Sequence, residues 1–242
     1  MAKYGKLEWN QRNIINASEE IFHRLDETHY REPEFAYKKI DQYYERFDIP
    51  EATTREGIIN FIPRRWPGRG GQDAICNVIL AYTRTAAALE EMVRRIVFKH
   101  YKIPEQSTGY IFRMMKYKEV NFGCSDHTNR EFFAVLDLNQ VDGLEMKYDG
   151  RWREIGVKPS TFLVMAGEPL KDWSEGKIHP LKHRVTMLGN RERYSVGLFS
   201  YYNEQAESSR AMVKQMSKLR IESSKSKAKD IPKEQVERSR RS

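Results

Sequence analysis

The chain reads Phe-Phe-Ala-Val-Leu-Asp-Leu over residues 132–138 and Arg-Tyr-Ser-Val-Gly-Leu-Phe-Ser-Tyr-Tyr over residues 193–202, and these stretches decide the fold. From residue 110 onward the apolar side chains follow a period of two, which is the period of a β-strand. Residues 161–166 and 184–188 continue this pattern. Asp149-Gly150 is predicted to form a tight hairpin turn. Short strands separated by turns predict a sandwich or a barrel.

The N-terminal part of the chain is predicted to be helical. Residues 1–50 read as helices with polar faces, and Pro50 is expected to end the last of them. Residues 51–71 are predicted to be a loop, because Pro63, Trp66-Pro67-Gly68 and Gly70-Gly71 interrupt any regular pattern.

A further helix is predicted around residues 89–97. Its apolar residues recur at helical spacing, whereas Glu90 and Arg94 lie off that stripe. The stripe consists of Leu89, Met92, Val93, Ile96 and Val97. We expect it to pack against the sheet as a scaffold.

Composition indicates a cytoplasmic protein of one domain. The chain has 242 residues and two cysteines, Cys76 and Cys124, which does not suggest a disulfide framework. It contains no apolar run long enough for a transmembrane helix, and residues 1–6 lack the apolar stretch of a secretory signal.

Residues 204–242 form a basic tail, with 11 Lys/Arg against 6 Asp/Glu in a chain of net charge +8. The tail lacks interleaved aromatic residues, so we expect a solvated, disordered extension. A basic tail of this kind could also contact nucleic acid or an acidic membrane.

His127 and His183 are candidate metal ligands. Two histidines and one carboxylate on one face of an ion form the site of non-haem Fe(II) oxygenases. In a strand, residues i and i+2 share a face, so Asn129 is expected beside His127, with Asp126 pointing away. Asn129 offers one neutral carbonyl oxygen where a carboxylate is expected. His179 is too far along the strand to share an ion with His183, and we expect a surface or loop role for it.

Arg193 and Ser195 are candidate anion-binding residues. They share a strand face, and an arginine fork with a hydroxyl can hold a carboxylate. A metal site with such a clamp nearby suits a chelating keto acid.

With these motifs the chain resembles the plant-type Fe(II)/2-oxoglutarate-dependent dioxygenases. That family has His-x-Asp, then His-Arg-Val, then Arg-x-Ser, and here Asn129 replaces the Asp. Residues 140–145 and 173–179 agree with the family as well. Residues 89–95 and 113–117 and the Trp66-Pro67 segment resemble its AOP-like branch in particular. The region before residue 36 and the C-terminal tail depart from the family.

The resemblance implies an α+β fold, a double-stranded β-helix or jelly roll with N-terminal helices packed outside. We divide the chain into a helical and loop segment at 1–84, truncated relative to the family, a helix plus jelly-roll core at 85–203, and the tail at 204–242.

The resemblance also implies the site and the reaction. His127 and His183 would bind Fe(II), with Asn129 a weak ligand or none. Arg193 and Ser195, with Tyr117 as a further contact, would bind 2-oxoglutarate. Ascorbate would support an oxidation of a small organic metabolite in secondary metabolism, with release of succinate and CO2. The alternative is a catalytically degenerate jelly roll that binds an organic acid, a protein or a nucleic acid.

Overall fold

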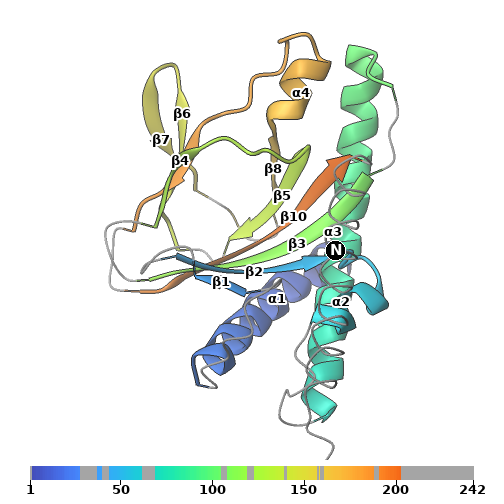
Figure 1. The fold of residues 1–242 in the computed structure, drawn as a ribbon, viewed down its shortest axis with the longest axis vertical. Helices are drawn as coiled ribbons and strands as arrows, with labels where there is room; N and C mark the ends of the chain where they lie inside the picture. The colour runs from blue at the N-terminus through green and yellow to red at the C-terminus, as the bar shows by residue number, and fades with distance from the viewer. Residues whose placement is uncertain are drawn as a thin grey trace, which may run out of the picture. The chain divides into compact units, whose positions relative to one another are not determined.

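The computed structural model contains two antiparallel sheets and four helices among the residues that it describes (Figure 1). The structure describes residues 2–27, 37–39, 44–61, 69–104, 108–118, 123–138, 141–156, 158, 161–187 and 191–202. The predicted tail at 204–242 and the Trp66-Pro67 segment lie outside these residues.

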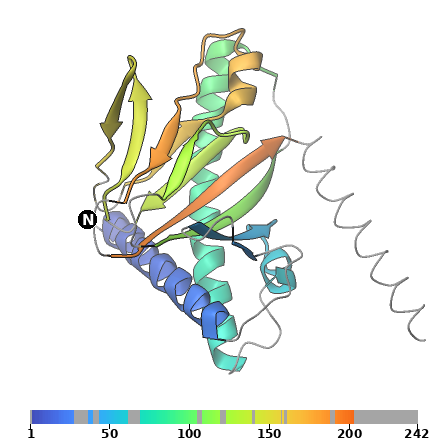
Figure 2. The same ribbon diagram turned by 60° about the vertical axis from the view of Figure 1, so that its left-hand side comes forward.

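The larger sheet has six strands in the order β1-β2-β3-β10-β5-β8. Its strands are β1 (Tyr37–Lys39), β2 (Tyr44–Pro50), β3 (Thr108–Tyr117), β5 (Phe133–Leu138), β8 (Leu163–Ala166) and β10 (Arg193–Tyr202). The smaller sheet has four strands in the order β4-β9-β6-β7. Its strands are β4 (Cys124–His127), β6 (Leu144–Tyr148), β7 (Arg151–Glu154) and β9 (His183–Val185). Figure 2 shows the two sheets facing each other.

The strands from β3 to β10 pair as nested partners. Strand β3 pairs with β10, β4 with β9, β5 with β8 and β6 with β7, each pair antiparallel. This is one long hairpin rolled up so that successive pairs fall alternately in the two sheets, which is the arrangement of a jelly roll. At its tip, Asp149 and Gly150 have φ of 49° and 73°, as a tight hairpin turn requires.

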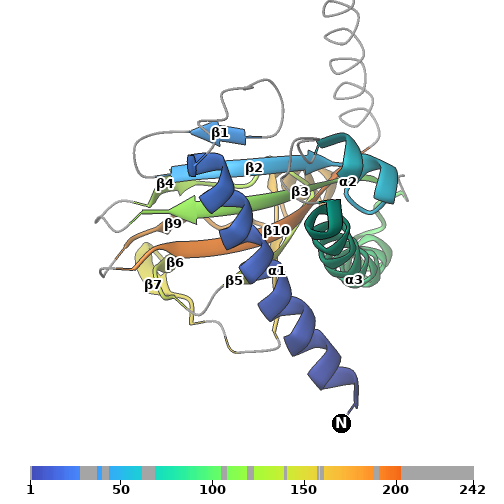
Figure 3. The same ribbon diagram turned by 90° about the horizontal axis from the view of Figure 1, so that it is seen from below.

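The helices are α1 (Ala2–Glu27), α2 (Arg55–Phe61), α3 (Arg69–Tyr101) and α4 (Glu168–Trp173). Helix α1 crosses β3 and β10 on the outer face of the larger sheet, with α3 beside it (Figure 3). Because helices and antiparallel strands form separate layers, the fold is α+β. None of the described helices is long and apolar enough to cross a membrane.

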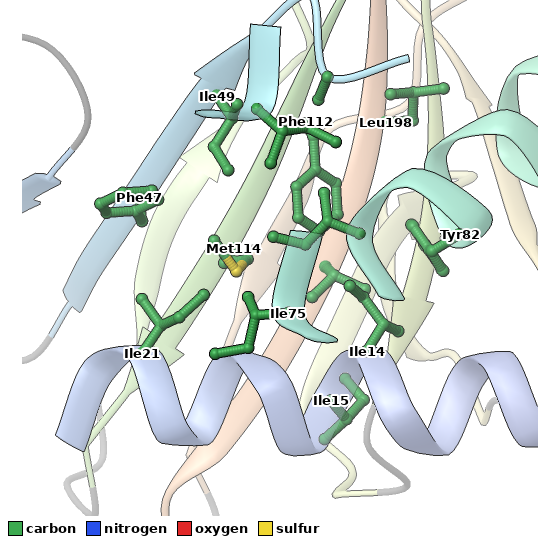
Figure 4. Packing of buried hydrophobic residues seen from close by; sticks show 14 of the residues in the cluster. Ile14, Ile15, Ile21, Phe47, Ile49, Ile75, Tyr82, Phe112, Met114 and Leu198 are labelled. Carbon is green, nitrogen blue, oxygen red and sulfur yellow. The ribbon is translucent and has the colours of Figure 1, made fainter. Parts of the chain in front are cut away.

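Alternation along the strands divides the apolar side chains between two cores. Phe112 and Met114 of β3 face the helices, where they pack with Ile14 of α1 and Tyr82 of α3 (Figure 4). Met115 packs in a separate cluster inside the jelly roll. Full burial of each such side chain contributes roughly 1.5–3 kcal/mol. The helical layer therefore stabilises the sheet from outside and leaves the interior of the roll for a site.

The predicted helix at the end of the first 50 residues is wrong. Tyr37–Lys39 and Tyr44–Pro50 are strands β1 and β2, and β2 pairs along its whole length with β3. Pairing with a long neighbouring strand outweighs the weak local preference of these residues. The predicted loop at 51–71 is wrong in part, because Arg55–Phe61 is helix α2 and α3 already begins at Arg69.

The predicted buried face of the long helix is wrong in part, because Leu89, Val93 and Val97 pack against the cores but the other two residues of the stripe do not. Met92 and Ile96 are 61% and 65% exposed, whereas Glu90 is fully buried. Glu90 accepts a hydrogen bond from the Tyr110 hydroxyl at 2.9 Å and forms an ion pair with Arg94. These polar partners allow Glu90 to enter the interface. Helix α3 also runs through residue 84, where we placed a segment boundary.

Candidate active site

Pairing of β4 with β9 brings the two candidate histidines together. His127 lies directly opposite His183, and their ring centroids are 4.3 Å apart with the rings tilted by 53°. The register shifts between Cys124 and His127, so the end of β4 is irregular. His127 is exposed and His183 is buried. Two imidazoles this close offer one ion two nitrogen ligands.

Both rings are oriented through Nδ1. His127 Nδ1 lies 2.9 Å from the Ser125 carbonyl oxygen, and His183 Nδ1 lies 3.1 Å from that of Leu181. A carbonyl only accepts, so Nδ1 carries the proton and Nε2 keeps its lone pair, as a metal ligand requires. Burial, with the neighbouring His127 ring adding to it, lowers the pKa of His183 to about 4. His183 is therefore neutral at neutral pH.

Asn129 lies beyond the end of β4, not within the strand as the sequence pattern predicts, yet it lines the same cavity as both histidines. It is 6% exposed, and its side-chain Nδ2 has no hydrogen-bond partner among the described residues. The backbone carbonyl oxygen of Asn129 accepts a hydrogen bond from the backbone N–H of Glu168 at 2.8 Å. A Cβ at Gly167 would lie 1.6 Å from the Glu131 carbonyl oxygen, so only glycine permits this close approach.

Neighbouring polar residues do not complete the site. Asp126 is exposed and forms an ion pair with Lys182 at 3.5 Å, outside the cavity. His179 is exposed in the segment before β9. Within the described ranges, no group of three His, Cys, Asp or Glu side chains could hold a metal ion. The donors near the histidine pair are thus two imidazoles, the Asn129 amide and the Cys124 thiol, whose Sγ lies 3.9 Å from His127 Nδ1.

Arg193 is held inside the roll without an ion-pair partner among the described residues. It is 1% exposed, and its Nε donates to the Val141 carbonyl oxygen at 3.1 Å. Its two terminal nitrogens have no hydrogen-bond partner in the described part of the chain. Burial lowers the pKa of Arg193 below its ordinary value, yet a guanidinium remains charged in proteins. Unpaired donors on a buried cation are costly, so this side chain suits an anionic ligand.

The candidate residues converge on one partly open cavity of about 60 Å³. His127, His183, Arg193, Ser195 and Tyr117 all line it, together with Asn129. The rest of the wall is mostly apolar, and includes Met115, Leu136, Leu138, Leu144, Met165, Val185 and Phe199. The candidate metal ligands and the candidate anion-binding residue thus share one cavity.

Sequence reasoning missed two residues of this cavity. Tyr44 of β2 stacks on Tyr117, with centroids 5.0 Å apart and planes within 6°. Arg113 lies over the Phe199 ring at 4.6 Å and pairs with Asp48 at 2.8 Å. The sequence could have indicated Arg113 as a cavity residue, because it shares a strand face with Tyr117. It could not have indicated Tyr44, because the segment that contains Tyr44 is predicted to be a helix.

The two imidazoles fit the metal-binding part of an oxygenase site, and the terminal nitrogens of Arg193 fit its acid-binding part. The carboxylate that would complete the metal ligands is replaced by the amide of Asn129. Residues 96–200 match the sequence profile of the 2OG-Fe(II) oxygenase superfamily. The matched stretch contains every candidate site residue except Tyr44.

Curated relatives extend the likeness beyond residues 96–200. The chain is 35% identical over 175 residues to the probable 2-oxoglutarate-dependent dioxygenase AOP1 of Arabidopsis thaliana, covering 65% of this chain and 57% of that protein. It is 33% identical over 212 residues to AOP1.2 of the same plant, covering 78% and 65%. The chain thus spans less than two thirds of the length of these relatives.

Solved structures show that the fold is shared. The dioxygenase for auxin oxidation 1 from Arabidopsis thaliana, in its 2-oxoglutarate complex, superposes with a TM-score of 0.71 at 21% identity, covering 81% of this chain and 79% of that one. The rice dioxygenase for auxin oxidation gives a TM-score of 0.66 at 23% identity, covering 80% and 68%.

Proposed function

We propose that the chain is an Fe(II)- and 2-oxoglutarate-dependent oxygenase of the AOP-like branch. It would oxidise a small organic metabolite and convert 2-oxoglutarate to succinate and CO2. One observation carries the proposal: the paired imidazoles line a single cavity with Arg193, whose two terminal nitrogens have no hydrogen-bond partner among the described residues.

Each residue has a role that follows from its position. His127 and His183 would hold Fe(II) through Nε2, with Asn129 a weak ligand or none. Arg193 would bind the distal carboxylate of 2-oxoglutarate through its two free nitrogens, because a fork matches a carboxylate. Ser195 lines the same cavity and would donate its hydroxyl to that carboxylate. Tyr117 lies over Arg193 and would fix its orientation.

When bound, iron would supply the redox chemistry that activates dioxygen. The protein's contribution is to bind, orient and exclude water. Seven apolar side chains in the wall remove water from the cavity, which strengthens the attraction between Arg193 and an anion. The carbonyls of Ser125 and Leu181 keep the imidazoles in the tautomer that binds a metal.

A second candidate function is supported by Asn129. The amide at this position suggests a degenerate jelly roll that keeps Arg193 as an anchor and binds an organic acid without turnover. Such a protein would bind 2-oxoglutarate or a similar diacid equally well with and without a metal.

Other parts of the proposal rest on the sequence. We place the protein in the cytoplasm, in secondary metabolism, with ascorbate as a supporting reductant. The division at residues 84 and 203, and any nucleic-acid contact of the basic tail, also stay predictions.

The test is succinate formation by the full chain with Fe(II), 2-oxoglutarate and ascorbate, combined with 2-oxoglutarate binding. His183→Ala should abolish succinate formation, whereas His179→Ala, at an exposed histidine of the same region, should not. Succinate formation that survives His183→Ala would contradict the assigned site. Binding of 2-oxoglutarate without turnover, unaffected by metal, would favour the degenerate alternative.

A further inference from the structure

The described lining of the cavity contains no Asp or Glu side chain. Two arginines, Arg113 and Arg193, line it. Arg113 forms ion pairs with Asp48 and Glu131, with N···O distances of 2.8 and 3.5 Å. Arg193 has no hydrogen-bond partner for its terminal nitrogens in the parts that the structure describes. Asp142 attracts Arg193 but forms no ion pair with it in the described residues, so the cavity offers an anion an unpaired positive charge.

A dication between His127 and His183 would add to that charge. Neither imidazole brings a negative charge, because His183 is neutral and a metal-bound His127 must be so. Asn129 is the buried polar side chain beside the pair, and it can offer only a neutral oxygen. Charges in a partly desolvated cavity interact more strongly than in water, so Arg193 opposes the bare metal.

The side-chain amide of Asn129 also has an unused hydrogen-bond donor. Its Nδ2 is buried without a partner in the described chain, although such groups are nearly always hydrogen-bonded in folded proteins. The amide is thus free to adjust to a ligand that enters the cavity beside the metal.

The 2-oxoglutarate dianion would relieve both positive charges together. One carboxylate can meet the metal while the other meets Arg193. We infer that Asn129 makes metal binding dependent on the keto acid, because the negative charge that a protein carboxylate would give the metal must come from the co-substrate. The inference rests on the proposed function. By thermodynamic linkage, the metal must raise 2-oxoglutarate affinity by the same factor.

The test uses Mn²⁺ as an oxygen-stable probe, with the full chain and titrations in the presence and absence of saturating 2-oxoglutarate. In the natural protein, 2-oxoglutarate should tighten Mn²⁺ binding by about 10- to 100-fold, within the usual range of coupling between two sites. In Asn129→Asp, Mn²⁺ alone should bind roughly tenfold more tightly. The enhancement by 2-oxoglutarate should then fall by at least about threefold, because the protein now supplies the charge.

Two further variants separate charge from other effects. Asn77→Asp makes the same substitution at an exposed position of α3, where Asn77 accepts a hydrogen bond from Arg55, and it should leave both affinities unchanged. Asn129→Ala keeps the site neutral and should retain the enhancement. A loss of enhancement in Asn129→Ala equal to that in Asn129→Asp would overturn the charge argument.

Failure of the inference is distinguishable from failure of the proposed function. If Mn²⁺ binds and 2-oxoglutarate enhances its binding equally in the natural protein and in Asn129→Asp, the oxygenase proposal stands and the role of Asn129 is wrong. If Mn²⁺ does not bind with or without 2-oxoglutarate, both are wrong.

Discussion

The guanidinium of Arg193 lies over the ring of Tyr117, with 5.2 Å from Cζ to the ring centroid. The two residues are directly opposite in the pairing of β10 with β3, and Tyr44 lies opposite Tyr117 in the pairing of β3 with β2. Three adjacent strands therefore place Tyr44, Tyr117 and Arg193 in one row across the sheet. The two tyrosines of this row therefore hold the Arg193 side chain from one side.

Arg193→Ala should weaken 2-oxoglutarate binding by roughly 1.5–3 kcal/mol, the range for hydrogen bonds to charged groups. Arg193→Lys should not restore the affinity, because the planar fork is lost. Calorimetric titration in the presence of Mn²⁺ measures both. Arg151→Ala, at an exposed position of β7, is the control. Unchanged affinity in either Arg193 variant would argue against the clamp.

Tyr44→Ala should destabilise the fold and weaken 2-oxoglutarate binding together. Truncation of a buried aromatic side chain costs roughly 3–5 kcal/mol of unfolding free energy, and Tyr117 loses its stacking partner. Tyr44→Phe keeps the stack and should stay within about 1 kcal/mol of the natural protein. Urea unfolding and titration with 2-oxoglutarate give the two quantities. An affinity unchanged in Tyr44→Ala would show that Tyr117 needs no support from β2.

Asp137 should make stability depend on pH. It is 3% exposed on β5, and burial raises its pKa to about 7 despite hydrogen bonds from Gln11 and the Leu138 backbone. A raised acid pKa contributes stability that is present below the unfolded pKa and lost as pH rises through about 7. Asp137→Asn should therefore raise the unfolding free energy by about 1–3 kcal/mol at pH 8 and have little effect near pH 4.

Urea unfolding at the two pH values measures this difference. Asp149→Asn, in the exposed hairpin turn, should show no such dependence. Equal effects of Asp137→Asn at pH 8 and pH 4 would mean that the carboxyl group does not titrate as its burial requires.

Truncation after Asn203 should leave the fold intact. The sequence from Glu204 onward has few apolar residues, so ordering it gains little to offset the loss of conformational entropy. The melting temperature should change by less than about 2 °C, the shift for well under 1 kcal/mol in a domain of this size. A larger drop in a thermal scan would show that Val213, Met216 and Leu219 pack on the core.

Asn129→Asp should increase turnover as well as metal affinity. A carboxylate completes the two-histidine, one-carboxylate set and adds negative charge beside the dication. Succinate formation in air, measured for both proteins, should appear or rise in the variant. Tighter metal binding without turnover would mean a repaired metal site in a pocket that no longer supports the reaction.

The period-two pattern of the strands predicted a sandwich or a barrel, and the resemblance to the dioxygenase family implied the jelly roll in particular. Residues 193–202 were predicted as a strand and are β10 with the same bounds. The Asp149-Gly150 turn is likewise confirmed. Strands β1 and β2 could not be predicted, because their stability depends on β3, a partner far along the chain.

The buried face of α3 could be predicted only in part, for a different reason. Apolar spacing favours Met92 and Ile96, but burial of Glu90 depends on Tyr110 in another element. In the site, motif spacing was enough to select His127, His183 and Arg193. The position of Asn129 after the strand end depends on a loop geometry that no local pattern specifies.

The nested pairing of the strands has a kinetic consequence. His127 and His183 meet only when β4 and β9, separated by the whole β5–β8 region, have closed on each other. Contacts of such high sequence separation form slowly, because chain closure precedes any favourable contact. A metal held by the two rings would then stabilise the finished roll more than the transition state. It should slow unfolding while leaving the folding rate nearly unchanged.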